Sequence, residues 1–171
     1  MIVLMAGLPG TGKSALAHAI ASHIGASVLG KDEIRLALFS HQGVEYSTSQ
    51  DDFVMQVMLE AVGWMLRRDP ARVVILDGRT FSRRYQIDRV LEVAAELHQS
   101  WVILECVCSQ ETARSRIEQQ ARAREHVAGN RSFDLYLEVK ARFEPILHPR
   151  TLIDTDRPLD ECLNHALNAL R

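Results

Sequence analysis

Eight consecutive residues near the start of the chain have the types and spacing needed to hold a nucleotide phosphate. They match G-x-x-x-x-G-K-[ST], and they are Gly7, Leu8, Pro9, Gly10, Thr11, Gly12, Lys13 and Ser14. The glycines let the backbone turn its N–H groups toward a polyphosphate. Lys13 can reach the β- and γ-phosphates, and the Ser14 hydroxyl can bind Mg²⁺. The pattern therefore predicts a P-loop that binds a nucleotide together with Mg²⁺.

A carboxylate and an arginine three residues apart form a second candidate site. Asp32 and Arg35 follow the apolar run 26–29 and stand at the start of an expected helix, where this spacing puts them on one face. Asp32 could accept the proton of a hydroxyl that attacks the γ-phosphate, and Arg35 could bind the charge of the acceptor or the phosphate. The alternative is a helix N-cap by Asp32 beside a solvated arginine, and the two roles can coexist.

Asp77 ends a third apolar run, 72–76, and so occupies the position where P-loop proteins hold Mg²⁺. Gly78 follows it where motor and AAA-type ATPases usually have glutamate, and the chain has no N-K-x-D guanine motif. Phosphoryl transfer to a bound acceptor is thus favoured over hydrolysis. Three arginines close behind, at positions 79, 83 and 84, could bind an anionic acceptor or could form a solvated helix start; both readings stay open.

Predicted strands and helices alternate along the chain, and they would position these residues. Apolar runs predict strands at 2–6, 26–29, 72–76, 101–106 and 151–154. Helical periodicity predicts helices at 14–24, 51–68, 84–97, 110–122, 132–143 and 158–170. This alternation indicates a parallel sheet covered by helices on both faces, with its ligands beyond the carboxyl ends of the strands.

Length and charge narrow the class of protein. A chain of 171 residues fits one domain, 1–171, and its net charge of −2 argues against general adhesion to nucleic acid or membranes. No run reaches the roughly 18 apolar residues of a membrane span. Since a core strand follows Met1 at once, we expect a cytoplasmic protein. Cys106, Cys108 and Cys162 lack metal-site spacing and are expected to be free thiols.

The P-loop, the D-x-x-R of Asp32 and Arg35, the Asp77-Gly78 pair and a later arginine-rich segment together resemble the small P-loop kinases. The resemblance is to the group with polynucleotide 5′-hydroxyl kinases, chloramphenicol phosphotransferase and zeta toxins. It implies a three-layer α/β fold with a five-stranded parallel sheet in the order 2-3-1-4-5. It also implies ATP and Mg²⁺ as cofactors, Asp32 as general base and Arg35 as its catalytic neighbour.

The same resemblance implies an arginine-bearing lid that closes on ATP after the fourth strand, here at about 114–131. Arg116 best matches the first lid arginine and would have both a binding and a catalytic role. Gln119 and Gln120 stand where the second is usually found. Arg122 or Arg124 would then substitute in ATP binding, since a guanidinium can stack on adenine and bind phosphate oxygens.

These observations favour an ATP-dependent kinase that transfers the γ-phosphate to a hydroxyl of a small molecule, acting as a monomer or weak homodimer. A 5′-hydroxyl nucleic-acid kinase and a non-catalytic ATP-binding regulator remain alternatives. The few aromatic residues and the slightly acidic charge disfavour a nucleic-acid channel. The acceptor stays open, because a fold does not dictate its substrate; the segment 40–52 is expected to shape its pocket.

Overall fold

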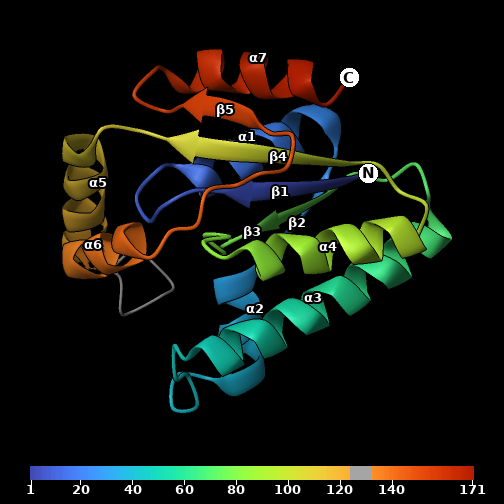
Figure 1. Cartoon of the computed structure of the whole chain (residues 1–171), viewed down its shortest axis with the longest axis horizontal. Helices are drawn as coiled ribbons and strands as arrows, with labels where there is room; N and C mark the ends of the chain where they lie inside the picture. Colours follow the sequence, from blue (N-terminus) through green and yellow to red (C-terminus); the bar gives the residue numbers. More distant parts are fainter. Residues whose placement is uncertain (124–131) are drawn as a thin grey trace.

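The computed structural model describes residues 1–123 and 132–171, and its centre is a five-stranded parallel sheet (Figure 1). The strands are β1 (Ile2–Ala6), β2 (Ser27–Gly30), β3 (Val74–Asp77), β4 (Trp101–Val107) and β5 (Thr151–Asp154). Their order across the sheet is β2-β3-β1-β4-β5, and every neighbouring pair runs parallel. The predicted fold class and strand order are confirmed.

Strand β1 is the middle of the sheet and is entirely buried, as a continuous apolar run predicts. Ile2, Leu4 and Ala6 belong to one core cluster, whereas Val3 and Met5 belong to another. Successive side chains of a strand point to opposite faces, so this division places one apolar core on each side of the sheet. The two cores make the molecule three layers thick.

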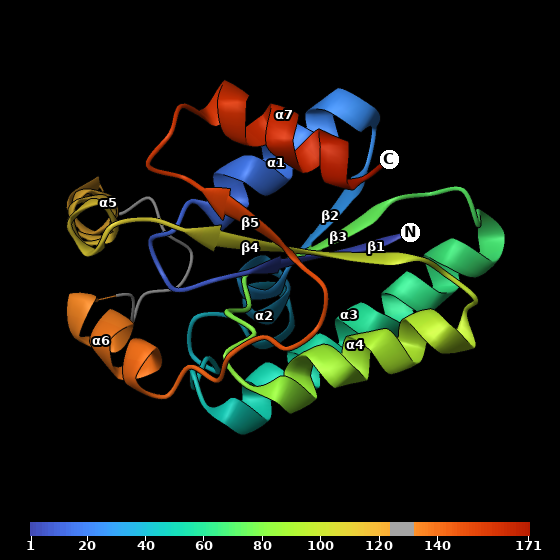
Figure 2. The same cartoon turned by 45° about the horizontal axis from the view of Figure 1, so that its top comes forward.

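Helices cover both faces (Figure 2). Helices α1 (Lys13–Ile24) and α7 (Leu159–Ala169) pack on one face, and α3 (Thr48–Arg68) and α4 (Arg84–Glu96) on the other. Three more helices, α2 (Lys31–Phe39), α5 (Gln110–Ala123) and α6 (Phe133–Ala141), complete the described elements. Helices α5 and α6 lie beyond the carboxyl end of β4. The described part of the chain contains no helix long and apolar enough to cross a membrane.

Two helix ends differ from the predicted ones by two residues or more, for local reasons. Helix α3 begins at Thr48 rather than at residue 51, because the Ser47 side chain accepts a hydrogen bond from the Gln50 N–H and caps an additional turn. Helix α6 ends at Ala141, two residues before the predicted end. Arg142 and Phe143 therefore lie in the connection to β5.

Gly7 is the tightest backbone position where the sheet meets the P-loop. Its φ is +132°, and a Cβ atom there would lie 2.3 Å from the carbonyl oxygen of Cys106 on β4. Gly25 at the end of α1 also has positive φ, at +70°, but a Cβ atom there would meet nothing within 4 Å. Of these two glycines, only Gly7 would require the backbone of a neighbouring strand to move if a side chain were added.

We predict that Gly7→Ala destabilises the protein by more than Gly25→Ala does. Gly25→Ala carries only the backbone strain of positive φ, about 1–2 kcal/mol, whereas Gly7→Ala adds a steric collision with β4. Thermal or denaturant unfolding of both variants provides the measurement. Equal losses of stability would show that the contact with Cys106 is unimportant.

Candidate functional site

The P-loop joins β1 to α1 and presents the positive end of that helix. Gly12 is the N-cap residue, no side chain caps the helix, and its first turn contains no acidic residue. The backbone N–H groups of this turn thus keep their partial positive charge for an anion. Two bonds fix the shape of the loop: the Gly7 N–H donates to the Thr80 carbonyl at 3.1 Å, and the Thr11 hydroxyl donates to the Leu8 carbonyl at 2.8 Å.

Lys13 is only 6% exposed although it carries a charge. Its ammonium donates to the carbonyls of Gly7 at 2.9 Å and Leu8 at 2.7 Å. These bonds keep the cation within the loop itself, where a lysine can meet the phosphates of a nucleotide. The predicted P-loop thus has the geometry that its sequence requires.

Asp77 lies beside the P-loop because of the strand register. Leu76 pairs with Leu4, so the next residue of β3 stands level with Met5, two residues before the loop begins. Asp77 is 4% exposed, and its Oδ1 atom accepts no hydrogen bond within the described residues. A buried carboxylate oxygen without a donor is costly, and a hard cation such as Mg²⁺ would satisfy it.

Ser14 and Asp77 are the predicted ligands of Mg²⁺, and this role stays a prediction. Among the residues that the structure describes, no group of three His, Cys, Asp or Glu side chains could hold a metal ion by itself. A metal at this place would therefore depend on the phosphate oxygens of a nucleotide and on water for its remaining ligands. Such shared coordination is usual for Mg²⁺ in sites that transfer phosphate.

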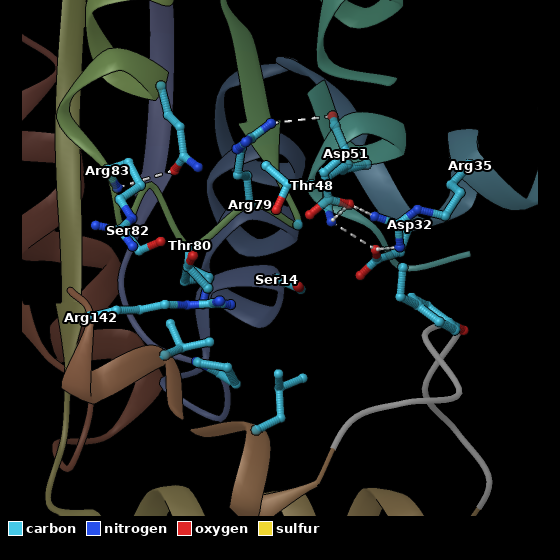
Figure 3. A pocket seen from close by; sticks show the side chains of 18 of the residues that line it. Ser14, Asp32, Arg35, Thr48, Asp51, Arg79, Thr80, Ser82, Arg83 and Arg142 are labelled. Carbon is cyan, nitrogen blue, oxygen red and sulfur yellow. Dashed lines mark hydrogen bonds and ion pairs between the residues drawn. The ribbon is translucent and has the colours of Figure 1, made fainter. Parts of the chain in front are cut away.

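A cavity of about 350 Å³ opens in front of Ser14 (Figure 3). Segments that are distant in the sequence form its wall: the P-loop, α2, the start of α3, the segment after β3, and α6 with the residue that follows it. Tyr46, Thr48 and Asp51 belong to this wall, so the segment 40–52 contributes to the pocket; that an acceptor binds there stays a prediction.

Asp32 and Arg35 face this pocket and pair with each other. The Arg35 guanidinium donates to Asp32 Oδ1 at 2.9 Å, and Arg35 is only 2% exposed. Asp32 does not cap α2: the N-cap residue is Gly30, and no side chain caps this helix end. The capping role considered above is wrong, because Asp32 stands in the first turn, where its side chain bonds cations instead.

Two further residues that the sequence did not single out complete this cluster. The Lys31 ammonium lies 2.8 Å from Asp51 Oδ1 and 3.4 Å from Asp32 Oδ1, and Arg35 also pairs with Asp51. Two cations are thus shared between two carboxylates. Lys31 could have been noticed, since the chain has only three lysines. Asp51 had no such signal, because only tertiary contact between α2 and α3 brings it here.

Backbone strain accompanies the pocket on two sides. Tyr46 has φ of +51° and its ring lies 5.2 Å from the Arg35 guanidinium carbon. Phe81 has φ of +52° and is buried in the segment after β3. Residues other than glycine adopt such values at a cost of about 1–3 kcal/mol, and they cluster at binding sites. Both strained residues lie next to side chains of the pocket wall: Tyr46 contacts Arg35, and Phe81 precedes Ser82.

The three arginines after β3 have different environments. Arg79 lines the pocket and donates to Asp52 Oδ1 at 2.5 Å and to the Asp51 carbonyl at 3.2 Å. Arg83 also lines it and pairs with Glu144 at 3.0 Å. Arg84 is not part of the pocket wall. The structure therefore brings two of the three to the wall of this pocket.

The two predicted lid arginines that the structure describes, Arg116 and Arg122, are not in this pocket wall. Arg116 donates to the hydroxyl of Thr155 at 3.1 Å and to its carbonyl at 2.7 Å, and the same hydroxyl bonds the Thr11 carbonyl of the P-loop. Arg116 thus lies beside the loop. The Arg122 side chain is 84% exposed and 4.0 Å from Glu118. Arg124 lies outside the described residues, as does part of the predicted lid.

Comparisons with known proteins agree with this geometry. Residues 2–146 match the family model AAA_33, which is described as an AAA domain. The chain belongs to this family. It is a P-loop family, and the predicted kinase-like P-loop fold is confirmed by solved structures of kinases. No curated protein matches the sequence.

Three solved structures illustrate the likeness. A protein from Chloroflexus aurantiacus described as a predicted kinase has a TM-score of 0.77 at 18% identity, with 99% of this chain and 98% of the other covered. APS kinase CysC from Mycobacterium tuberculosis, in complex with AMPPNP and APS, has a TM-score of 0.72 at 18% identity, covering 99% and 96%. A gluconokinase from Sinorhizobium meliloti has 0.67 at 20%, covering 99% and 90%.

We predict that Lys31 loses its proton near pH 8. Burial lowers its pKa to about 8, although the nearby Asp32 carboxylate acts to raise it. A ¹³C NMR titration can follow the Cε resonance of Lys31, one of three lysines in the chain. The Asp32→Asn variant should shift the midpoint lower, and a wild-type midpoint near the usual 10.5 would contradict the prediction.

The same shift affects stability. Because the folded protein releases this proton at lower pH than the unfolded chain, the contribution of Lys31 to the free energy of unfolding rises between about pH 8 and pH 10.5.

Asp77→Asn should stabilise the nucleotide-free protein, by about 1 kcal/mol, because it removes a buried charge whose Oδ1 lacks a donor. It should also weaken the enhancement of AMPPNP affinity by Mg²⁺, since an amide oxygen is a poorer ligand than a carboxylate. Thermal unfolding and calorimetry with and without Mg²⁺ test both effects. An unchanged dependence on Mg²⁺ would remove Asp77 from the proposed metal site.

Proposed function

We propose that the protein is an ATP-dependent kinase that transfers the γ-phosphate of ATP to a hydroxyl group of a small molecule. The observation that carries the proposal is the pocket in which the P-loop residues Lys13 and Ser14 and the carboxylate of Asp32 line one cavity. The residues that would hold the phosphate donor and the carboxylate that would act as the base thus line the same cavity. A regulator that only binds nucleotide would not require this carboxylate.

The P-loop side of the pocket has the groups that would bind the phosphates of the donor. The N–H groups of the loop and of the first turn of α1, together with Lys13, would bind the β- and γ-phosphates. Mg²⁺, held by Ser14 and Asp77 with the phosphate oxygens, would neutralise part of their charge when bound. AMPPNP in the structurally similar APS kinase supports ATP as the donor for this chain.

The acceptor side contains a carboxylate with one oxygen available. Asp32 Oδ1 pairs with Arg35 and Lys31, while Oδ2 has no hydrogen-bond donor within the described residues. The two cations fix the orientation of the carboxylate. Oδ2 would accept the hydrogen bond of an acceptor hydroxyl and receive its proton as the oxygen attacks the γ-phosphorus. Most of the catalytic effect would come from positioning and charge, as in other phosphoryl transfers.

The size of the pocket supports a small acceptor. Its volume of about 350 Å³ is at the lower end of the range for sites that bind one small molecule. The names of the similar structures, a gluconokinase and an APS kinase, also support phosphotransferase activity in this chain. A 5′-hydroxyl nucleic-acid kinase remains the second candidate from the sequence, but none of the pocket features described here favours it.

We predict that Asp32→Asn lowers phosphate transfer by at least about a hundredfold while ATP binding stays within a few fold. Glu33→Gln is the matched control, because it removes the same charge from a neighbouring residue that does not line the pocket. The measurement is transfer from labelled ATP to a library of hydroxyl-bearing metabolites and 5′-hydroxyl oligonucleotides. Equal transfer by Asp32→Asn and wild type would remove Asp32 as the base.

Lys13→Ala should instead weaken nucleotide binding itself, because Lys13 is expected to contact the phosphates before any transfer takes place. Calorimetry with AMPPNP and Mg²⁺ measures this directly and requires no acceptor. If Lys13→Ala binds AMPPNP as wild type does, the loop is not the donor site, and the proposed function fails at its first step.

A further inference from the structure

Arg142 is a cation of the pocket wall that the sequence analysis did not assign to the site. It follows directly after α6 and lines the same cavity as Lys13 and Ser14. Figure 3 shows its side chain extending across the pocket toward Ser14. Arg142 is an exposed residue, and its side chain points toward the side of the pocket where phosphates would bind.

Arg142 differs from the other cations of the pocket wall in having no polar partner. Each of the others bonds a carboxylate or a carbonyl, and they are Lys13, Lys31, Arg35, Arg79 and Arg83. Within the described residues the guanidinium of Arg142 forms neither a hydrogen bond nor an ion pair. It is therefore available to bind an anion in this pocket.

The backbone that carries Arg142 is nevertheless fixed. The next residue, Phe143, packs against the apolar core beneath α3 and α4. Glu144 bonds the segment after β3 three times: its N–H donates to the Ser82 carbonyl at 2.9 Å, and its carboxylate accepts from the Arg83 guanidinium at 3.0 Å and the Arg84 N–H at 2.8 Å. A cation on a fixed backbone needs little reorganisation to meet a charge that develops in front of it.

The described lid arginines do not provide such a cation. Arg116 donates to Thr155 and Arg122 pairs with Glu118, and neither of them lines the pocket. A phosphoryl group in transfer carries negative charge on its three equatorial oxygens, and an arginine that binds them commonly accelerates transfer by about 10³–10⁵. Arg142 is placed to meet this requirement.

We propose that Arg142 is a catalytic residue whose guanidinium binds the oxygens of the phosphoryl group during transfer. This proposal rests on the proposed function. In the step, the acceptor oxygen forms a bond to the γ-phosphorus, and the bond from that phosphorus to the β–γ bridging oxygen breaks. ADP leaves with the electron pair, and the hydroxyl proton passes to Asp32. Arg142 donates hydrogen bonds throughout and transfers no proton.

A transition-state mimic tests this role without knowledge of the acceptor. ADP affinity is measured with Mg²⁺, first alone and then with aluminium fluoride, which takes the place of the transferred phosphoryl group. Wild type should bind ADP at least about tenfold more tightly with the fluoride. Arg142→Gln should bind ADP normally but lose this gain. Lys140→Gln is the matched control, since Lys140 lies in the same helix end, outside the pocket wall, and bonds Gln110.

The outcomes separate this proposal from the proposed function. An equal gain in Arg142→Gln and wild type, or no gain in wild type, would overturn the role of Arg142. Thermal unfolding shows whether the variant is folded, and Arg142→Lys should recover part of the gain because it restores the charge. If the gain depends on Arg142 but labelled ATP yields no product with any hydroxyl compound, the role of Arg142 stands and hydroxyl phosphorylation fails.

Discussion

The site depends on the parallel pairing of β1 with β3 on one side and β4 on the other. Because all three strands run in the same direction, the segments that follow them leave the sheet at one edge. The P-loop, Asp77 with its arginines, and the start of α5 are consequently neighbours. The pairing is close enough that only glycine fits at position 7, where the chain passes the Cys106 carbonyl. The geometry of the sheet therefore also restricts the residue type at the start of the phosphate-binding loop.

The parts of the site that sequence could predict are those encoded locally. The P-loop is eight consecutive residues, Asp32 and Arg35 are one helical turn apart, and Asp77 ends a strand; each is recognisable from its immediate neighbours. Sheet order required the family resemblance. Asp51 and Arg142 could not be predicted, because they reach the pocket through packing of α3 and through contacts after α6 that no short pattern records. The alternative in which Asp32 caps α2 was wrong, because the Asp32 side chain bonds nearby cations and not the N–H groups of the helix N-terminus.

The cluster of Lys31, Asp32, Arg35 and Asp51 shares two cations between two carboxylates. The cations orient the Asp32 carboxylate, and Asp51 takes part of the charge of both cations. Phosphoryl transfer depends mainly on such positioning, since it leaves little covalent chemistry for the protein to do. The same ion pairs join α2 to α3 beside the pocket.

Thr155 supports the P-loop from a distant part of the sequence. Its hydroxyl bonds the Thr11 carbonyl, the Val107 carbonyl and the Arg116 guanidinium, and so it joins the P-loop to the ends of β4 and β5. This hydroxyl is synthesised 144 residues after the carbonyl that it bonds in the loop. A nascent chain therefore carries the phosphate-binding sequence long before it can complete the support of that loop.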